Sequence, residues 1–145
     1  MGIFNAGAPF LSDLNLIFQV VIVVVLVLAL FAIVKRKYAI HGAMMGSGIV
    51  LHTISIFTAM LPSFLSFGFP FSGFPIRLST LLVIHAAAGS TVEVLGVWLV
   101  AAWIFNRTKV DSCFRRKNIM LATIILWILE FVLGVFVYMT LYPLL

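Results

Sequence analysis

Four long apolar stretches constrain the fold of this chain more than any other feature of its sequence. Each is long enough to cross a bilayer, because the hydrocarbon core needs about 20 residues of α-helix. Only 9% of the 145 residues are charged and the mean hydropathy is +1.28, whereas an ordinary soluble domain carries about 25% charged residues. The sequence therefore predicts an integral membrane protein and excludes both a soluble globule and a disordered chain.

The apolar stretches predict helices over residues 14–34, 38–61, 79–105 and 118–142 of a single transmembrane domain, residues 1–145. Short connections make the first and last pairs of helices antiparallel neighbours. The first helix has no ionisable group inside it and is expected to face lipid or to act as a scaffold. Pro62 is expected to end the second helix, and the Phe-, Gly- and Pro-rich segment after it to form an outer loop in the interface. The predicted fold class is an all-α, antiparallel four-helix membrane bundle.

Basic residues gather in two short connections, because eight of the nine Lys and Arg residues lie in residues 35–37 and 107–117. The positive-inside rule places both connections on the cytoplasmic side of the cell membrane and both chain termini on the other side. The net charge of +5 is therefore attributed to topology and to contacts with anionic lipid headgroups. Nucleic acid is not an expected partner. The single Cys113 excludes an internal disulfide.

Five ionisable side chains fall inside the predicted helices, where such groups are costly and are therefore candidate functional residues. They are His41, His52, His85, Glu93 and Glu130. The helical rise of 1.5 Å per residue places His52 and His85 at similar depths, and Glu93 and Glu130 near the middle of the bilayer.

The matched pair of histidines favours haem ligation. Imidazoles of His52 and His85, facing each other at one depth, would form the bis-histidine site of a b-type haem. Gly48 and Gly89, on the same helix faces, would let the flat macrocycle approach the backbone. His41 lies near the cytoplasmic end and could serve a second haem only with a further ligand. The sequence thus predicts an electron-transfer subunit of a larger respiratory-type membrane oxidoreductase, without catalysis by this chain alone.

Two alternatives remain open. In one, the chain is a cofactor-free accessory or assembly subunit of a membrane oxidase complex, whose glycines pack helices together. Without a metal, Glu93 and Glu130 are expected to exchange a proton or to hydrogen-bond a histidine or Tyr138. In the other, the two glutamates join His52 and His85 to bind zinc, copper or iron. Other integral membrane subunits of a redox complex are the expected partners in every case.

Short motifs spread along nearly the whole chain carry a family resemblance. They are residues 11–15 (Leu-Ser-Asp-Leu-Asn), the basic turn 35–37, His41, Met44, His85, Arg116, Lys117, Thr123, Trp127, Gly134 and Tyr138. In these motifs the chain resembles the YozB-like family of small four-helix bacterial membrane proteins. The resemblance implies a four-helix fold, a link to the assembly of haem-copper oxidases, and functional roles for His41 and His85.

Two departures from the family pattern accompany this resemblance. The family usually has a His just before its fourth helix, where this chain has Arg115 and Arg116. His52 and Glu130 have no counterpart in the family pattern. A site built on His52 would therefore replace one that used the missing histidine.

Overall fold

The computed structural model describes residues 7–66, 74–105 and 115–143. Its helices are α1 (Phe10–Val34), α2 (Tyr38–Ser55), the π-helical turn η1 (Ile56–Met60), α3 (Leu61–Ser66), α4 (Ile76–Phe105) and α6 (Lys117–Leu141). Residues 67–73 of the predicted outer loop, and residues 107–114 of the predicted basic loop with Cys113, lie outside the described residues.

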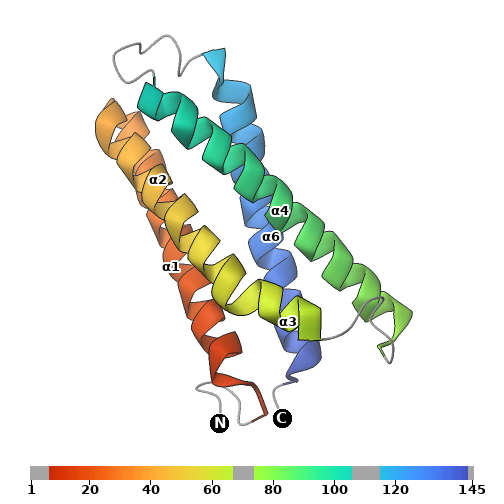
Figure 1. Cartoon of the computed structure of the whole chain (residues 1–145). Helices are drawn as coiled ribbons and strands as arrows, with labels where there is room; N and C mark the ends of the chain where they lie inside the picture. Colours follow the sequence, from red (N-terminus) through yellow and green to blue (C-terminus); the bar gives the residue numbers. More distant parts are fainter. Residues whose placement is uncertain (1–6, 67–73, 106–114, 144–145) are drawn as a thin grey trace.

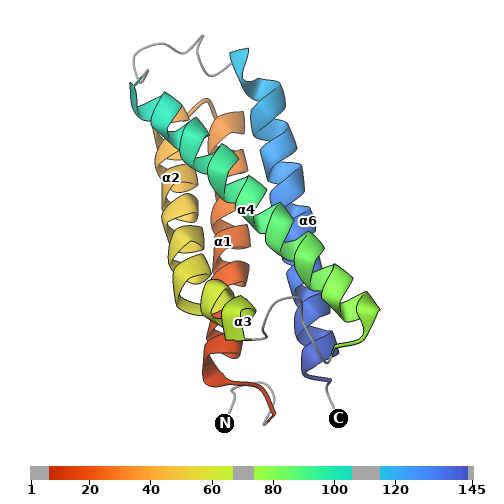
Figure 2. The same cartoon turned by 45° about the vertical axis from the view of Figure 1, so that its right-hand side comes forward.

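Four helices are long and apolar enough to cross a membrane. Three of them are α1, α4 and α6. The remaining one is the continuous unit Tyr38–Ser66, which is made of α2, η1 and α3. The prediction of an all-helical chain with four candidate membrane spans is confirmed. Helix α1 packs along α2, α4 packs along α6, and α2 also contacts α4. The start of α1, the end of α6 and α3 lie at one end of the molecule, and the turn between α1 and α2 lies at the other (Figures 1 and 2).

The basic turn between α1 and α2 is closed by a left-handed residue. Arg36 has φ of 59°, its N–H donates to the carbonyl of Ile33 at 2.9 Å, and the N–H of Lys37 donates to Ala32 at 2.9 Å. This pair of hydrogen bonds is the Schellman arrangement that ends many helices. It reverses the chain within three residues, so α1 and α2 must lie side by side.

Two helices begin earlier than predicted. Helix α1 begins at Phe10 instead of residue 14, and α4 begins at Ile76 instead of residue 79. A proline directly precedes each of them, Pro9 and Pro75. Proline is well tolerated at a helix start, because the first N–H groups of a helix have no partner within it. Both helices therefore begin at the residue that directly follows a proline. Helix α6 agrees with its prediction to within one residue at each end.

The predicted end of the second helix at Pro62 is wrong, because the helical path continues to Ser66. Pro62 has no N–H to donate to the carbonyl four residues earlier, which ordinarily breaks an α-helix. Here the turn before it widens instead, and the N–H of Leu61 donates to the carbonyl of Ile56, five residues back. Such π-turns are rare and occur frequently at functional sites.

The centre of the molecule is a small apolar cluster to which all four spans contribute. It consists of Ile22 and Leu26 of α1, Ile49 of α2, Val92 of α4 and Trp127 of α6, all buried. Leu78 and Leu82 of α4 form a second cluster. The central cluster fixes which face of each helix points inward, and the polar residues described below lie on those same faces.

Candidate functional site

The central cluster is continued along the helices by ionisable side chains. His52 follows Ile49 by three residues on α2, and Glu130 follows Trp127 by three residues on α6. Residues three apart on a helix share a face, so the packing that buries the apolar pair also buries the polar pair. His52 is 0% exposed and Glu130 is 1% exposed.

The ring of His52 is held by its neighbours. Its Nδ1 lies 2.9 Å from Oε2 of Glu93 on α4, and Thr53 donates its hydroxyl to Oε1 of the same carboxylate at 2.5 Å. Trp127 meets the His52 ring edge to face, with centroids 5.3 Å apart. While Glu93 is ionised, its carboxylate only accepts hydrogen bonds, so Nδ1 of His52 then carries the hydrogen. The other ring nitrogen, Nε2, is therefore left as the free acceptor.

The carboxylate of Glu130 lies between two histidines. Its Oε2 is 3.9 Å from Nε2 of His52, and its Oε1 is 3.7 Å from Nδ1 of His85 on α4. Both oxygens of Glu130 and both of these ring nitrogens are buried without a hydrogen-bond partner. A buried polar atom without a partner costs about 1–3 kcal/mol. Several of them side by side therefore indicate a functional site rather than a packing feature.

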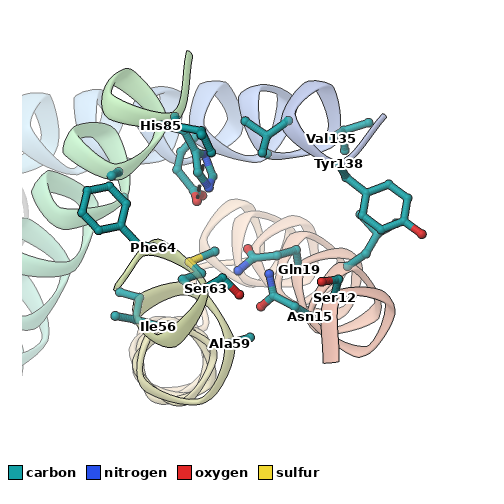
Figure 3. Close-up of a pocket in the computed structure, with 18 of the residues that line it drawn as sticks. Ser12, Asn15, Gln19, Ile56, Ala59, Ser63, Phe64, His85, Val135 and Tyr138 are labelled. Atoms are coloured by element: carbon teal, nitrogen blue, oxygen red, sulfur yellow. Dashed lines mark ion pairs between the residues drawn. The ribbon is translucent and has the colours of Figure 1, made fainter. Parts of the chain in front are cut away.

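A cavity of about 500 Å³ opens beside this cluster. His85, Glu130, Gly89 and Gly134 contribute to its lining, whereas His52 is absent from it. Gly134 allows the close approach of His85, because a Cβ atom there would lie 3.0 Å from Cε1 of the ring. Figure 3 shows His85 projecting into the space between the helices.

The first helix contributes a polar wall to this cavity, which its sequence did not predict. Gln19 donates its Nε2 to Oγ of Ser55 at 3.0 Å, and the Ser55 hydroxyl in turn donates to Asn15. Oε1 of Gln19 is buried and has no hydrogen-bond partner. The signal available in the sequence was a lone glutamine in a run of Val, Leu and Ile residues. The expectation that α1 is only lipid-facing or scaffold is therefore too narrow.

Another hydrogen bond joins the last turns of α6 to the first turn of α1. Tyr138 of α6 donates its hydroxyl to the carboxylate of Asp13 on α1, and Asp13 is 0% exposed. Tyr138 also lines the cavity. Asp13 is thus another buried carboxyl group that the sequence did not single out as a site residue.

The structure brings together four of the residues proposed from the sequence, namely His52, His85, Glu93 and Glu130. Of the two glycines predicted to lie beside a cofactor, Gly89 lies against Glu130, whereas Gly48 lies against Trp127 of the core.

His41 stands apart from the cluster. It is buried, and its Nδ1 lies 2.9 Å from the carbonyl oxygen of Ala29. Within residues 7–66, 74–105 and 115–143, no group of three or more His, Cys, Asp and Glu side chains is arranged to hold a metal ion.

Comparison with protein-family models, with curated proteins and with solved structures yields no match to this chain. The resemblance to the YozB-like family therefore stays a prediction.

Proposed function

We propose that this chain is a multi-pass protein of the cell membrane in which four ionisable side chains relay a proton to and from the cavity. The relay runs from Glu93 through His52 and Glu130 to His85. The proposal includes an antiparallel four-helix bundle with its basic connections on the cytoplasmic side, as the positive-inside rule requires. The cavity then lies in the outer half of the bilayer, and the start of α1 and the end of α6 face the non-cytoplasmic side.

The observation that carries this proposal is the continuous series of short separations along the four groups. They are 2.9 Å, 3.9 Å and 3.7 Å between successive nitrogen and oxygen atoms. Proton transfer requires hydrogen-bond distance or one intervening water, and such contacts are often long without a ligand. A small rotation of the Glu130 side chain, or one water on either side of it, would complete the relay.

The exposure of the four side chains supports a path with two accessible ends. The side chains of Glu93 and His85 are 20% and 16% exposed, whereas those of His52 and Glu130 are 0% and 1% exposed. A partly exposed carboxylate in the middle of a membrane helix is costly in lipid. The proposal therefore places Glu93 against another integral membrane subunit of a redox complex.

The buried position of Glu130 between two histidines favours proton exchange among these three side chains. An ionised carboxylate that is buried without a partner is strongly disfavoured. Among the described residues, His52 and His85 are the bases whose nitrogens lie within 4 Å of Glu130. Their protonation states are therefore linked, and a proton arriving at one group changes the others.

Infrared difference spectroscopy of the detergent-purified protein tests the relay. The pH is stepped between about 5 and 8, the range in which histidine titrates. The chain has two glutamates, Glu93 and Glu130, so ¹³C-labelling of glutamate isolates their carboxyl bands. We expect a labelled band that disappears in Glu130→Gln and persists in Asp13→Asn, a matched change at a buried carboxyl group outside the relay. Identical difference spectra from the wild-type protein and the Glu130→Gln variant would contradict the proposal.

Haem binding is the second candidate function, and one observation favours it. Nε2 of His52 is free while Nδ1 is held by a carboxylate, which is the arrangement of many metal-bound histidines. A bound haem would supply one-electron transfer at its iron. The carboxylate of Glu130 lies between His52 and His85. Bis-histidine ligation therefore requires the Glu130 side chain to turn away, and the described arrangement does not present such a site.

A dithionite-reduced minus air-oxidised absorption spectrum separates the two candidates. A sharp α-band with near-stoichiometric haem, lost in both His52→Ala and His85→Ala, would support haem. A flat spectrum from protein purified with its native partners would exclude haem and leave the relay standing.

A further inference from the structure

The cavity combines apolar walls with buried hydrogen-bond acceptors on two sides. We propose that it binds an aromatic diol with an apolar tail, a ligand of the hydroquinone class. This inference rests on the proposed proton exchange at Glu130, because the ionised form of that carboxyl group accepts hydrogen bonds with both of its oxygens. The cavity volume of about 500 Å³ lies within the usual range for small-molecule sites, roughly 300–1,000 Å³.

The unpartnered atoms around the cavity define which hydrogen bonds a ligand must make. Gln19 on α1 presents Oε1, and Glu130 on α6 presents both carboxylate oxygens, all buried and without partners. Both residues line the cavity. Amide and carboxylate oxygens accept hydrogen bonds. A matching ligand therefore donates two of them, in different directions.

The orientation of Gln19 is fixed by its neighbours. Its Nε2 donates to Ser55, and the hydroxyl hydrogen of Ser55 is already used toward Asn15. The carbonyl oxygen of Gln19 is therefore the atom left for a ligand. Figure 3 shows Gln19 and His85 extending toward the same space from opposite walls. Two hydroxyl groups on opposite sides of a flat ring would point toward these two walls.

The remaining walls suit the ring and an apolar tail. The lining includes Leu16, Ile56, Leu82, Phe131, Val135 and Leu141. The π-helical turn widens the second span where it lines the cavity, through Ile56, Ala59 and Met60. In a bilayer such walls exclude water and admit a molecule dissolved in the hydrocarbon phase.

The charges around the cavity argue against lipid anions. Among the described residues that line it, none is Lys or Arg. A fatty acid or a phosphate would bury its own negative charge beside the Glu130 carboxyl group, with no fixed cation to offset it. A neutral ligand that donates hydrogen bonds carries no such charge into the cavity.

Isothermal titration calorimetry of the full chain in detergent tests the proposal. The probe is para-benzohydroquinone with a decyl tail, kept reduced under argon. The matched ligands are its dimethyl ether, which donates no hydrogen bond, decanoic acid and decylamine. We expect the diol to bind and the ether to bind at least about tenfold more weakly, because the buried acceptors then stay unpaired. This comparison uses only the wild-type protein and does not depend on whether a variant folds.

Variants assign the binding to the two walls. Gln19→Leu should weaken diol binding by about tenfold or more, and Ser47→Ala, on the exposed face of α2, should leave it unchanged. An ether that binds as tightly as the diol would overturn the proposal, as would tighter binding of the acid or the amine, or a Gln19→Leu variant with wild-type affinity. If the wild-type protein does not bind the diol but shows the Glu130 infrared band, the ligand proposal is contradicted and the proton relay is not. If the wild-type protein binds the diol but shows no such band, the proton relay is contradicted and the ligand proposal is not.

Discussion

Nδ1 of His52 lies 2.9 Å from Oε2 of Glu93, although the two residues are 41 positions apart in the sequence. This hydrogen bond joins α2 to α4 inside the molecule. It orients the imidazole so that its other nitrogen faces Glu130, and both the relay and the haem hypotheses depend on that orientation. The same contact can be tested for its contribution to stability.

Removing the Glu93 carboxylate should destabilise the protein. Glu93→Ala leaves Nδ1 of His52 buried without its partner, at a cost of about 1–3 kcal/mol. Glu93→Gln keeps an acceptor oxygen and should cost less. Thermal unfolding in detergent, followed by circular dichroism, measures the difference. Thr91→Ala, at an exposed position of the same helix, is the control, and equal melting of Glu93→Ala and this control would refute the prediction.

Gly42 and Gly46, which lie four residues apart on α2, should respond differently to substitution by alanine. A Cβ atom at Gly42 would collide with the Trp103 ring, whereas one at Gly46 would lie 3.7 Å from Val100, an ordinary contact. Gly42→Ala should therefore destabilise the protein by about 1–3 kcal/mol. Gly46→Ala should be neutral or stabilising by up to about 1 kcal/mol, because alanine favours helix. Chemical denaturation of both variants checks the contrast, and similar losses at the two sites would contradict it.

The contact between Tyr138 and Asp13 should stabilise the end of the molecule where both termini lie. Tyr138→Phe removes one hydrogen bond from a fully buried carboxyl group and should lower stability by about 1 kcal/mol. Hydrogen exchange at the first turns of α1 measures the local effect. Thr140→Val, at an exposed position on α6, is the comparison. Unchanged protection in Tyr138→Phe would show that the contact does not hold α1 in place.

The single cysteine of the chain provides a test of membrane orientation. Cys113 lies in the second basic connection, which the positive-inside rule places in the cytoplasm. A membrane-impermeant maleimide should label it only after the cells are permeabilised. In a Cys113→Ser background, Gly7→Cys should be labelled in intact cells. Labelling of Cys113 in intact cells would reverse the proposed orientation.

Sequence reasoning located the spans well and their ends less well. Apolar character is a property of each stretch by itself, so all four spans were predictable. The ends depended on prolines, which start α1 and α4 after Pro9 and Pro75. Pro62 was predicted to stop a helix, but a π-turn lets the helical path continue. Whether a proline breaks a helix or only widens it depends on which carbonyl groups find other donors.

The candidate site was predictable in its residue types and not in its arrangement. Ionisable side chains inside apolar helices are conspicuous, so His52, His85, Glu93 and Glu130 could be singled out directly. The sequence did not predict that the carboxylate of Glu130 lies between the two imidazoles. Gln19 was overlooked because an uncharged side chain gives a weak signal, although its buried carbonyl oxygen helps to define the proposed ligand.

The sequence by itself determined that this chain forms helices long and apolar enough to span a membrane. Composition, the lengths of the apolar stretches and the clustering of basic residues specify helices for a bilayer, because transfer into hydrocarbon depends on each segment separately. The tertiary structure decided which polar side chains lie next to one another. The rotation of each helix about its axis is set by packing around Ile49, Val92 and Trp127. That packing alone brings His52 to Glu93 and Glu130, and places Gln19 on the wall of their cavity.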